Sequence, residues 1–251
     1  MRLGIGSYAY VRWAGVPEFP APPAPLTVDD LFDQAVWLGV RVVQIADNLP
    51  LGRLPAAERR RLAWKARPLG IQVETGTRGM EPGLLRRYLE IAREFGSPIL
   101  RTLPAGPDPH LSAEQAAARL REVAPEFESA GIRLAVGNHG RFKAAALRRI
   151  IDEARSEDVG VCLDTANSLG CGEGVGQVLD LLGELVFNLH IKDFVARRPA
   201  HNKGFIVEGA PAGRGPPGHP RRTRHGGALR TGCKRHRRAL AAARGGCRGV
   251  G

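Results

Sequence analysis

The stretch Gly131-Ile132-Arg133-Leu134-Ala135 shows the pattern that decides the fold of this chain. A glycine that can take the left-handed conformation ends a helix, and a short apolar run then begins a strand. The same pattern is present at Gly39-Val40-Arg41-Val42-Val43 and at Gly70-Ile71-Gln72-Val73-Glu74. A helix followed by a strand is therefore predicted at three places in the chain.

Short apolar runs of this kind recur seven times. They begin near Arg2, Arg41, Ile71, Ile99, Ile132, Val159 and Val186, and neighbouring starts are 27 to 39 residues apart. This spacing is the size of one strand–helix unit. Capping signals at Thr27 with Asp30 and at Ser112 with Gln115 mark the starts of two intervening helices. No complete Gly-rich phosphate loop follows any run, so the repetition favours an α/β fold of the (β/α)8 TIM-barrel type over a doubly wound sheet.

The positive charge of the chain is concentrated at its carboxyl end. The 251 residues carry a formal net charge of +12, but residues 214–251 alone contain 11 Lys and Arg and no Asp or Glu. The rest of the chain holds 26 basic and 25 acidic side chains, a nearly neutral balance. We therefore predict a barrel domain over residues 1–213. Residues 214–251 are predicted to be a basic, Gly- and Arg-rich disordered tail in place of the eighth strand–helix unit.

Composition excludes several classes of protein. No run of about 18 apolar residues is present, which argues against a membrane-spanning segment. The start Met1-Arg2-Leu3-Gly4 lacks the apolar core of a signal peptide. Four Cys are too few for a disulfide scaffold in a chain of this size, so a cytoplasmic protein with free thiols is the simpler interpretation.

Polar side chains recur where the apolar runs end, which is where barrel enzymes carry their chemistry. Each of these residues alone is compatible with a solvated loop position. Asp164 and His190 have the strongest case, because each directly ends an apolar run. A carboxylate and an imidazole are a ligand pair suited to Mn²⁺, Mg²⁺, Co²⁺ or Zn²⁺. The other residues at these ends are Ser7, Tyr8, Gln44, Asp47, Asn48, Glu74, Thr75, Arg78, Arg101, Asn138, His139, Asn167, Lys192 and Asp193.

Four motifs resemble a known family. They are Gly137-Asn138-His139-Gly140-Arg141-Phe142, Val161-Cys162-Leu163-Asp164-Thr165-Ala166-Asn167-Ser168, His190-Ile191-Lys192-Asp193 and Gly204-Phe205-Ile206-Val207-Glu208-Gly209. In this order they resemble the sugar phosphate isomerase/epimerase family of xylose isomerase-like TIM barrels. The resemblance runs from Leu3 to about Gly213. It is specific to the superfamily and weak on the substrate.

The resemblance implies a divalent-metal-dependent isomerase or epimerase of a small sugar, sugar phosphate or polyol. In that family the metal, most often Mn²⁺ or Mg²⁺, is held by a Glu, an Asp, a His and a second Glu after strands five to eight. The two Glu carboxylates move a proton through an enediolate. Here Asp164 and His190 match the Asp and the His. The candidate substrate-binding residues are Asn138, His139, Asn167, Lys192, Arg197 and Glu74.

Two departures from the family pattern bear on activity. The family reads E-N-H where this chain has Gly137-Asn138-His139, so the first Glu is replaced by a residue that can neither bind a metal nor move a proton. The family pattern also stops at about Gly213, before the eighth strand and its Glu. Regrouping possible codons of residues 215–220 by one base permits the family's G-R-L-D-I-P, and we favour a shift of reading frame over the alternative of a native tail. With neither family Glu in place, we expect little or no isomerase activity.

Loss of the eighth unit has a structural consequence as well. It leaves the first and seventh strands with unpaired edges, which invite pairing with another chain. We therefore expect poor solubility or a homodimer formed through these edges.

Two alternatives remain open at this stage. The first is an endonuclease IV-like nuclease, whose zinc ions need many His ligands, whereas residues 1–213 contain only His110, His139, His190 and His201. The second is a non-catalytic relative that binds polyanions through the tail. The tail lacks interleaved aromatic residues, so no specific nucleic-acid partner is expected.

Overall fold

A computed structural model describes residues 2–15, 20, 22–106, 110–211 and 213 of the chain. The predicted tail, residues 214–251, lies outside the described residues, as does any eighth strand–helix unit within it. In the described part, no helix is both long enough and apolar enough to cross a membrane.

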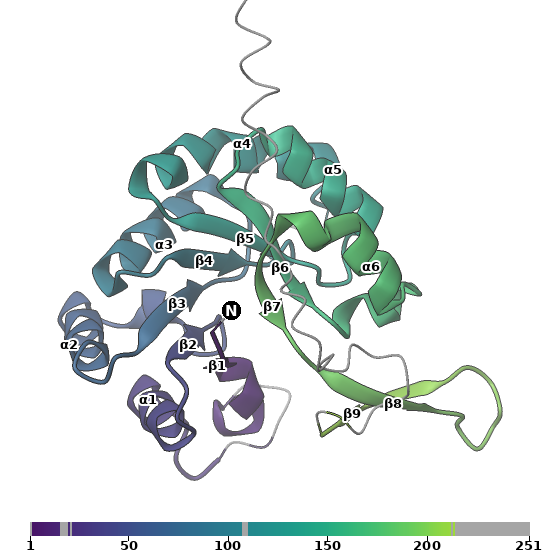
Figure 1. The fold of residues 1–251 in the computed structure, drawn as a ribbon, viewed down its shortest axis with the longest axis horizontal. Coiled ribbons are helices and arrows are strands. Elements are labelled where there is room, and N and C mark those ends of the chain that lie inside the picture. Colours follow the sequence, from purple (N-terminus) through teal and green to yellow (C-terminus); the bar gives the residue numbers. More distant parts are fainter. Residues whose placement is uncertain (1, 16–19, 21, 107–109, 212, 214–251) are drawn as a thin grey trace, which may run out of the picture.

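The centre of the molecule is a curled sheet of seven parallel strands in sequence order (Figure 1). Each strand pairs with its neighbours along the chain, and no pairing joins β1 to β7 in the described residues. The predicted repetition of strand and helix is therefore confirmed, in the form of a partly closed barrel. The strands are β1 (Gly4–Gly6), β2 (Val42–Ile45), β3 (Gln72–Gly76), β4 (Ile99–Thr102), β5 (Arg133–Gly137), β6 (Val159–Asp164) and β7 (Val186–His190).

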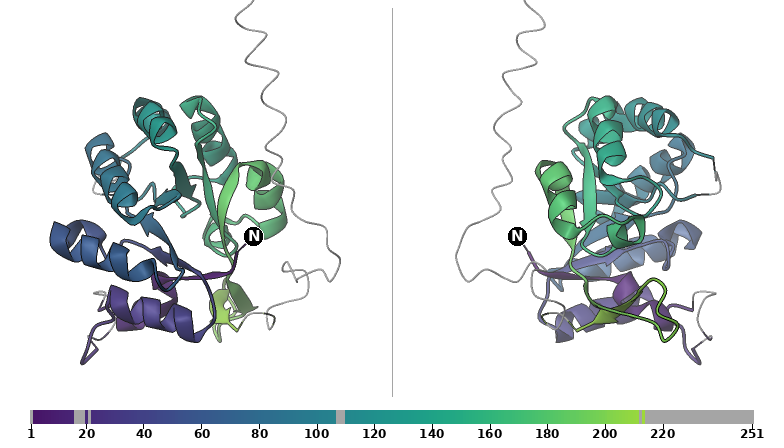
Figure 2. Two further views of the ribbon diagram at one scale, coloured as in Figure 1. Left: turned by 60° about the vertical axis from the view of Figure 1, so that its left-hand side comes forward. Right: turned by 90° about the vertical axis from the view of Figure 1, so that its right-hand side faces the viewer.

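Helices connect these strands and cover the outer side of the sheet (Figures 1 and 2). The α-helices are α1 (Val28–Trp37), α2 (Ala56–Ala66), α3 (Pro82–Phe95), α4 (Ala113–Ala130), α5 (Ala144–Ala154) and α6 (Val175–Leu182). Short 3-10 helices are η1 (Ser7–Trp13), η2 (Leu51–Arg53), η3 (Asn167–Cys171) and η4 (Gly183–Leu185). The apolar stripe of each α-helix packs on the apolar outer face of the sheet, and together they form the main core.

Local signals in the sequence explain where the helices begin and end. Thr27 and Ser112 begin α1 and α4 with complete capping boxes. Gly131 ends α4 with a φ of 64°, in the left-handed region. Because the next residues are apolar and β-branched, the chain enters β5 directly after this turn.

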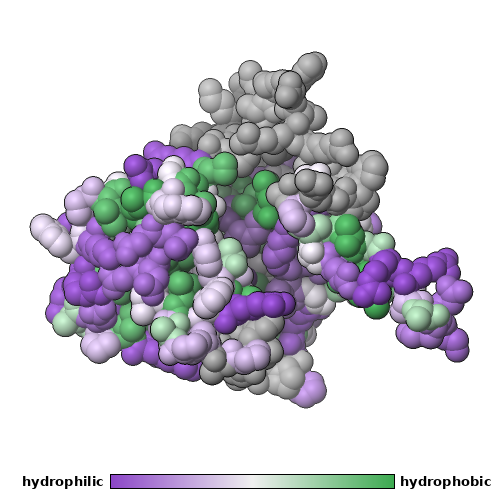
Figure 3. All heavy atoms as spheres, turned by 90° about the horizontal axis from the view of Figure 1, so that it is seen from below, coloured by the Kyte–Doolittle hydropathy of each residue, from purple (hydrophilic) through white to green (hydrophobic). Residues whose placement is uncertain are grey.

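The chain after β7 forms a two-stranded antiparallel hairpin instead of returning to the sheet. Its strands are β8 (Asp193–Arg197) and β9 (Ile206–Ala210). Figures 1 and 3 show this hairpin standing out from the body, with mainly hydrophilic residues at its tip. Among the described residues, β1 and β7 are thus the two edges of the sheet.

Candidate active site

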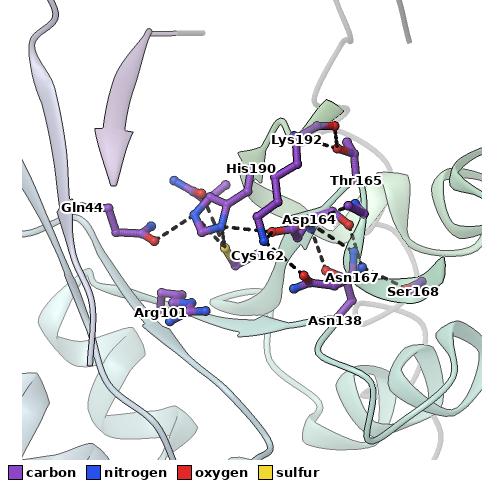
Figure 4. A network of polar contacts seen from close by, with 12 residues as sticks. Gln44, Arg101, Asn138, Cys162, Asp164, Thr165, Asn167, Ser168, His190 and Lys192 are labelled. Carbon is purple, nitrogen blue, oxygen red and sulfur yellow. Dashed lines mark hydrogen bonds and ion pairs between the residues drawn. The ribbon is translucent and has the colours of Figure 1, made fainter. Parts of the chain in front are cut away.

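Asp164 ends β6 and is almost completely buried. Its Oδ1 accepts hydrogen bonds from the backbone N–H groups of Ala166 and Asn167, at 3.0 and 3.3 Å. Its Oδ2 lies 2.8 Å from the Lys192 ammonium (Figure 4). The carboxylate is therefore held by two backbone donors and one positive charge.

Asn138, directly after β5, fixes the backbone of Asp164. The Asn138 Oδ1 accepts from the Asp164 N–H at 2.6 Å, and its Nδ2 donates to the Asp164 carbonyl at 2.9 Å. The same Nδ2 also donates to Ser168 Oγ at 3.1 Å. The side-chain amide of Asn138 thus ties the ends of β5 and β6 together, which sets where the Asp164 carboxylate points.

His190 ends β7 in register with Asp164. Its Nδ1 is 3.9 Å from Asp164 Oδ2, too far for a hydrogen bond, and its Nε2 is 2.8 Å from Gln44 Oε1. Burial lowers the pKa of His190 to about 4, helped by the positive charge of Arg101. A neutral imidazole whose Nε2 donates to Gln44 presents the lone pair of Nδ1 toward Asp164.

Glu74, on β3, is buried and belongs to the same interior network as His190. The Glu74 Oε2 accepts from Gln44 Nε2 at 3.1 Å and also from Asn188 Nδ2. Burial raises the pKa of Glu74, and the hydrogen bond from Gln44 opposes this. Because Gln44 donates to Glu74 through nitrogen, it accepts from His190 through oxygen, so Glu74 orients His190 through Gln44.

Lys192 follows β7 and connects two other predicted site residues, Asp164 and Asn167, with Thr165. Its Nζ contacts Asp164 and, at 3.2 Å, Asn167 Oδ1. Its backbone N–H donates to Thr165 Oγ1, whose hydroxyl donates back to the Lys192 carbonyl, both at 2.9 Å. Half of the Lys192 side chain is exposed, so its ammonium can reach a bound molecule.

A second group of charges surrounds Asp47, after β2. Its carboxylate accepts from Arg78 Nε at 2.6 Å, from Arg101 Nη1 at 3.2 Å and from the Tyr8 hydroxyl at 3.0 Å. Burial opposes ionisation of Asp47, but the hydrogen bond from Arg78 and the two guanidinium charges outweigh it and hold the pKa of Asp47 below its usual value. Burial and the charges of Arg78 and Arg101 lower the pKa of His139.

Only some of the predicted site residues therefore lie together in the structure. Asp164, His190, Asn138, Asn167 and Lys192 come together in one network. Glu74 reaches that network through Gln44. Arg197 lies on the exposed hairpin, where it pairs with Glu208 at 2.6 Å. The candidate metal ligands and substrate-binding residues did not include Gln44, Asp47, Arg78 and Arg101. Their only signal in the sequence was a position at the end of an apolar run.

Position 137 has little room for a side chain. A Cβ built on Gly137 would lie 2.5 Å from Leu103 Cδ2 and 3.5 Å from the Thr102 carbonyl oxygen. Leu103 is buried, so it already fills the space that a Glu at position 137 would enter first.

A divalent metal does not fit the described residues as a complete centre. In the described part of the chain, no three His, Cys, Asp or Glu side chains come together to hold an ion. Asp164 and His190 face each other, but the nearest charge to their carboxylate is the Lys192 ammonium. Two of the four ligands that the resemblance implies are thus present.

Comparison with known proteins identifies the family. The sequence profile of the family described as "Xylose isomerase-like TIM barrel" matches residues 83–225. A curated relative, 3-oxo-isoapionate decarboxylase of Pectobacterium atrosepticum, is 34% identical over 215 residues, which cover 86% of this chain and 77% of the relative. The chain belongs to the xylose isomerase-like TIM barrel family. The resemblance seen in the sequence and the predicted fold class are both confirmed.

Solved structures of other xylose isomerase-like barrels share this fold. A protein from Mycobacterium smegmatis in complex with magnesium superposes with a TM-score of 0.63 at 15% identity, covering 85% of this chain and 82% of that one. D-psicose 3-epimerase from Clostridium cellulolyticum H10, with D-tagatose, gives a TM-score of 0.62 at 16% identity, over 77% of this chain and 73% of that one. Membership of the family and the similarity to a named decarboxylase support an enzyme, and one structural relative binds a divalent metal.

Proposed function

We propose that this xylose isomerase-like barrel decarboxylates a small 3-oxo sugar acid through an enediolate. The proposal is supported by the similarity to 3-oxo-isoapionate decarboxylase over most of the chain. An enediolate is also the intermediate implied for the isomerases and epimerases of this fold, so the proposed reaction keeps the chemistry of the family and changes how the intermediate is formed.

The proposed reaction needs few protein groups. The bond between the carboxyl carbon and its neighbour breaks, and its electron pair moves to the 3-oxo oxygen as CO₂ leaves. The resulting enediolate then takes a proton from solvent on carbon, so that a 3-oxo carboxylate and one proton yield a ketose and CO₂. The protein must stabilise the negative oxygen as it forms and exclude competing reactions. No base is required to remove a proton from carbon.

The choice of decarboxylation over isomerisation or epimerisation depends on the glycine at position 137. Isomerisation or epimerisation requires a base that removes a proton from carbon and an acid that returns one. At position 137 the family's proton-transferring Glu is replaced by glycine, and Leu103 fills the adjacent space. Decarboxylation does not depend on that carboxylate, so it is the reaction that this chain's residues can still support.

The residues take the following roles in this proposal. The Lys192 ammonium, held by Asp164, stabilises the enediolate oxygen. Asn167 and His139 bind substrate hydroxyl groups, Asn138 positions Asp164, and Glu74 orients His190 through Gln44. Arg197, paired with Glu208, has no assigned role in this scheme.

The metal is a separate part of the proposal. Mn²⁺ or Mg²⁺, with Co²⁺ or Zn²⁺ as the other candidates, would have Asp164 and His190 as its ligands among the described residues. Because these residues do not form a complete centre, the scheme routes no step through the ion.

The decisive assay uses the full chain with 3-oxo-isoapionate, with and without added MgCl₂ or MnCl₂, and measures release of CO₂. We expect release of CO₂, reduced at least about 100-fold by Lys192→Gln, as is typical for removal of one group that stabilises an oxyanion. Lys203→Gln, on the exposed hairpin, is the matched control and should leave the rate unchanged.

A second candidate function is epimerisation of a ketose, supported by the epimerases among the structural relatives. It is tested in parallel with D-psicose, whose conversion to D-fructose is followed by chromatography. Interconversion of these ketoses without release of CO₂ from the 3-oxo acid would favour the epimerase and overturn the decarboxylase. The nuclease alternative gains no support from the described residues, since no cluster of zinc ligands forms among them.

A further inference from the structure

The Arg101 guanidinium is buried without a full set of hydrogen-bond partners. Only 7% of its side chain is exposed, and its Nε has no hydrogen-bond partner in the described structure. Figure 4 shows Arg101 next to His190 and Gln44 with no dashed line to any residue drawn. A buried N–H group of a charged side chain without an acceptor is unfavourable, so this arrangement indicates a missing acceptor.

The neighbours of Arg101 among the described residues leave part of its guanidinium without an acceptor. Its Nη1 reaches Asp47, but Arg78 and Tyr8 share the same carboxylate. The Tyr8 ring lies 5.8 Å from the Arg101 guanidinium carbon, which places an aromatic face on the cation. The neighbouring Cys162 is buried, and its sulfur is only a weak acceptor.

The carboxylates of the site do not satisfy the Arg101 Nε. Asp47 is bound by Arg78 and Arg101, Asp164 by Lys192, and Glu74 by Gln44 and Asn188. Among the described residues, none of these carboxylates bonds the Arg101 Nε. The carboxylate of a bound ligand would supply the missing acceptor.

We propose that Arg101, with Arg78 beside it, is a binding site for the carboxylate of a sugar acid. The planar guanidinium donates in a fork that matches a planar carboxylate, whereas the hydroxyl groups of a neutral sugar match this fork less well. A phosphate ester is tetrahedral and carries up to two negative charges, whereas a carboxylate is planar like the guanidinium. The inference rests on the proposed function in taking the acid to be the substrate, but Arg101 binds the carboxylate whether or not turnover follows.

The test measures binding by titration calorimetry on the full chain, with ligands that differ in one group. D-erythronate has a carboxylate, erythritol has a hydroxymethyl group in its place, and glycerol 3-phosphate presents a phosphate. We expect D-erythronate to bind at least about tenfold tighter than erythritol, and Arg101→Gln to weaken D-erythronate at least about tenfold, as for loss of a charge-assisted hydrogen bond. Arg101→Lys should restore part of the affinity, because it keeps the charge and loses the fork.

Controls keep the outcome interpretable. Arg86→Gln removes an arginine that pairs with Glu122 and Glu126 on the surface, and it should leave binding unchanged. If Arg101→Gln fails to fold, Arg78→Gln tests the same cluster at its exposed side, with a smaller expected loss of affinity.

The inference is overturned if erythritol binds as tightly as D-erythronate, or if folded Arg101→Gln binds D-erythronate normally. Tighter binding of glycerol 3-phosphate would overturn the carboxylate assignment. Binding of D-erythronate without release of CO₂ from 3-oxo-isoapionate would support this site and count against the decarboxylase. If Arg101→Gln releases CO₂ from 3-oxo-isoapionate at the wild-type rate, the result would support the decarboxylase and count against this site.

Discussion

Replacing Gly137 with alanine tests whether Leu103 occupies the space next to the end of β5. The new Cβ would approach Leu103 Cδ2 to 2.5 Å, far inside ordinary van der Waals contact. Leu103 is 1% exposed, so its side chain must shift within the interior to accommodate the new methyl group. Overpacking of this kind costs about 1 to 3 kcal/mol, so Gly137→Ala should lower the free energy of unfolding by that amount.

The sign of the effect should reverse once the leucine is removed. Leu103→Ala alone should cost about 2 to 5 kcal/mol through the cavity that it leaves. Gly137 does not have a positive φ, so alanine fits its backbone. In the Leu103→Ala background, Gly137→Ala should therefore be neutral or stabilise by about 0.4 to 1 kcal/mol, because alanine restricts the unfolded chain.

The assay is urea unfolding of the wild type, the two single variants and the double variant, followed by circular dichroism. The double-mutant cycle should yield a coupling energy of about 1 to 3 kcal/mol. A Gly137→Ala cost that is equal in both backgrounds, or a stabilising effect in the wild type, would show that Leu103 does not fill this space. The argument that a glutamate is poorly accommodated at position 137 would then fail.

Three further predictions concern the site and the helices. Asn138→Ala should lower the free energy of unfolding by about 1 to 3 kcal/mol in urea titrations, because it leaves the buried Asp164 N–H without its acceptor. A loss below about 0.5 kcal/mol, roughly the size of a surface substitution, would contradict this. The pKa of Glu74 is raised in the folded state from 4.5, so its stabilising contribution is present at low pH and lost as pH rises through the folded-state pKa. Glu74→Gln should therefore gain stability relative to the wild type as pH rises through that folded-state pKa, and parallel stability curves would refute the shift. Thr27→Ala should cost about 1 kcal/mol in thermal melts by removing the cap of α1, whereas Thr27→Ser should cost little.

The repeating units of the fold could be predicted from local signals alone. The runs that begin at Val159 and Val186 are the strands β6 and β7, and the helix ends at Gly39, Gly70 and Gly131 all have positive φ. These features depend on residues close together in the chain. The hairpin of β8 and β9 was not predicted, because its pairing depends on contacts such as Arg197 with Glu208 across a long connection that lacks a short-turn signature.

The candidate site was only partly readable from the sequence. Asp164 and His190 could be singled out because each ends an apolar run, and the structure places them in register. The contacts of Gln44 with His190 and of Glu74 with Asn188 could not be predicted, because they depend on how far the sheet curls. Arg101 looked like any other polar strand end, and only its burial next to His190 distinguishes it.

The sequential order of the strands in the sheet also has a consequence for how the chain folds. Because each strand pairs only with its neighbour in sequence, every backbone ladder can form as soon as the next strand leaves the ribosome. The bonds from His190 to Gln44 and from Asn188 to Glu74 join residues that are 146 and 114 positions apart. The active-site interior should therefore be the last part of the protein to assemble, after a scaffold of short-range units is already in place.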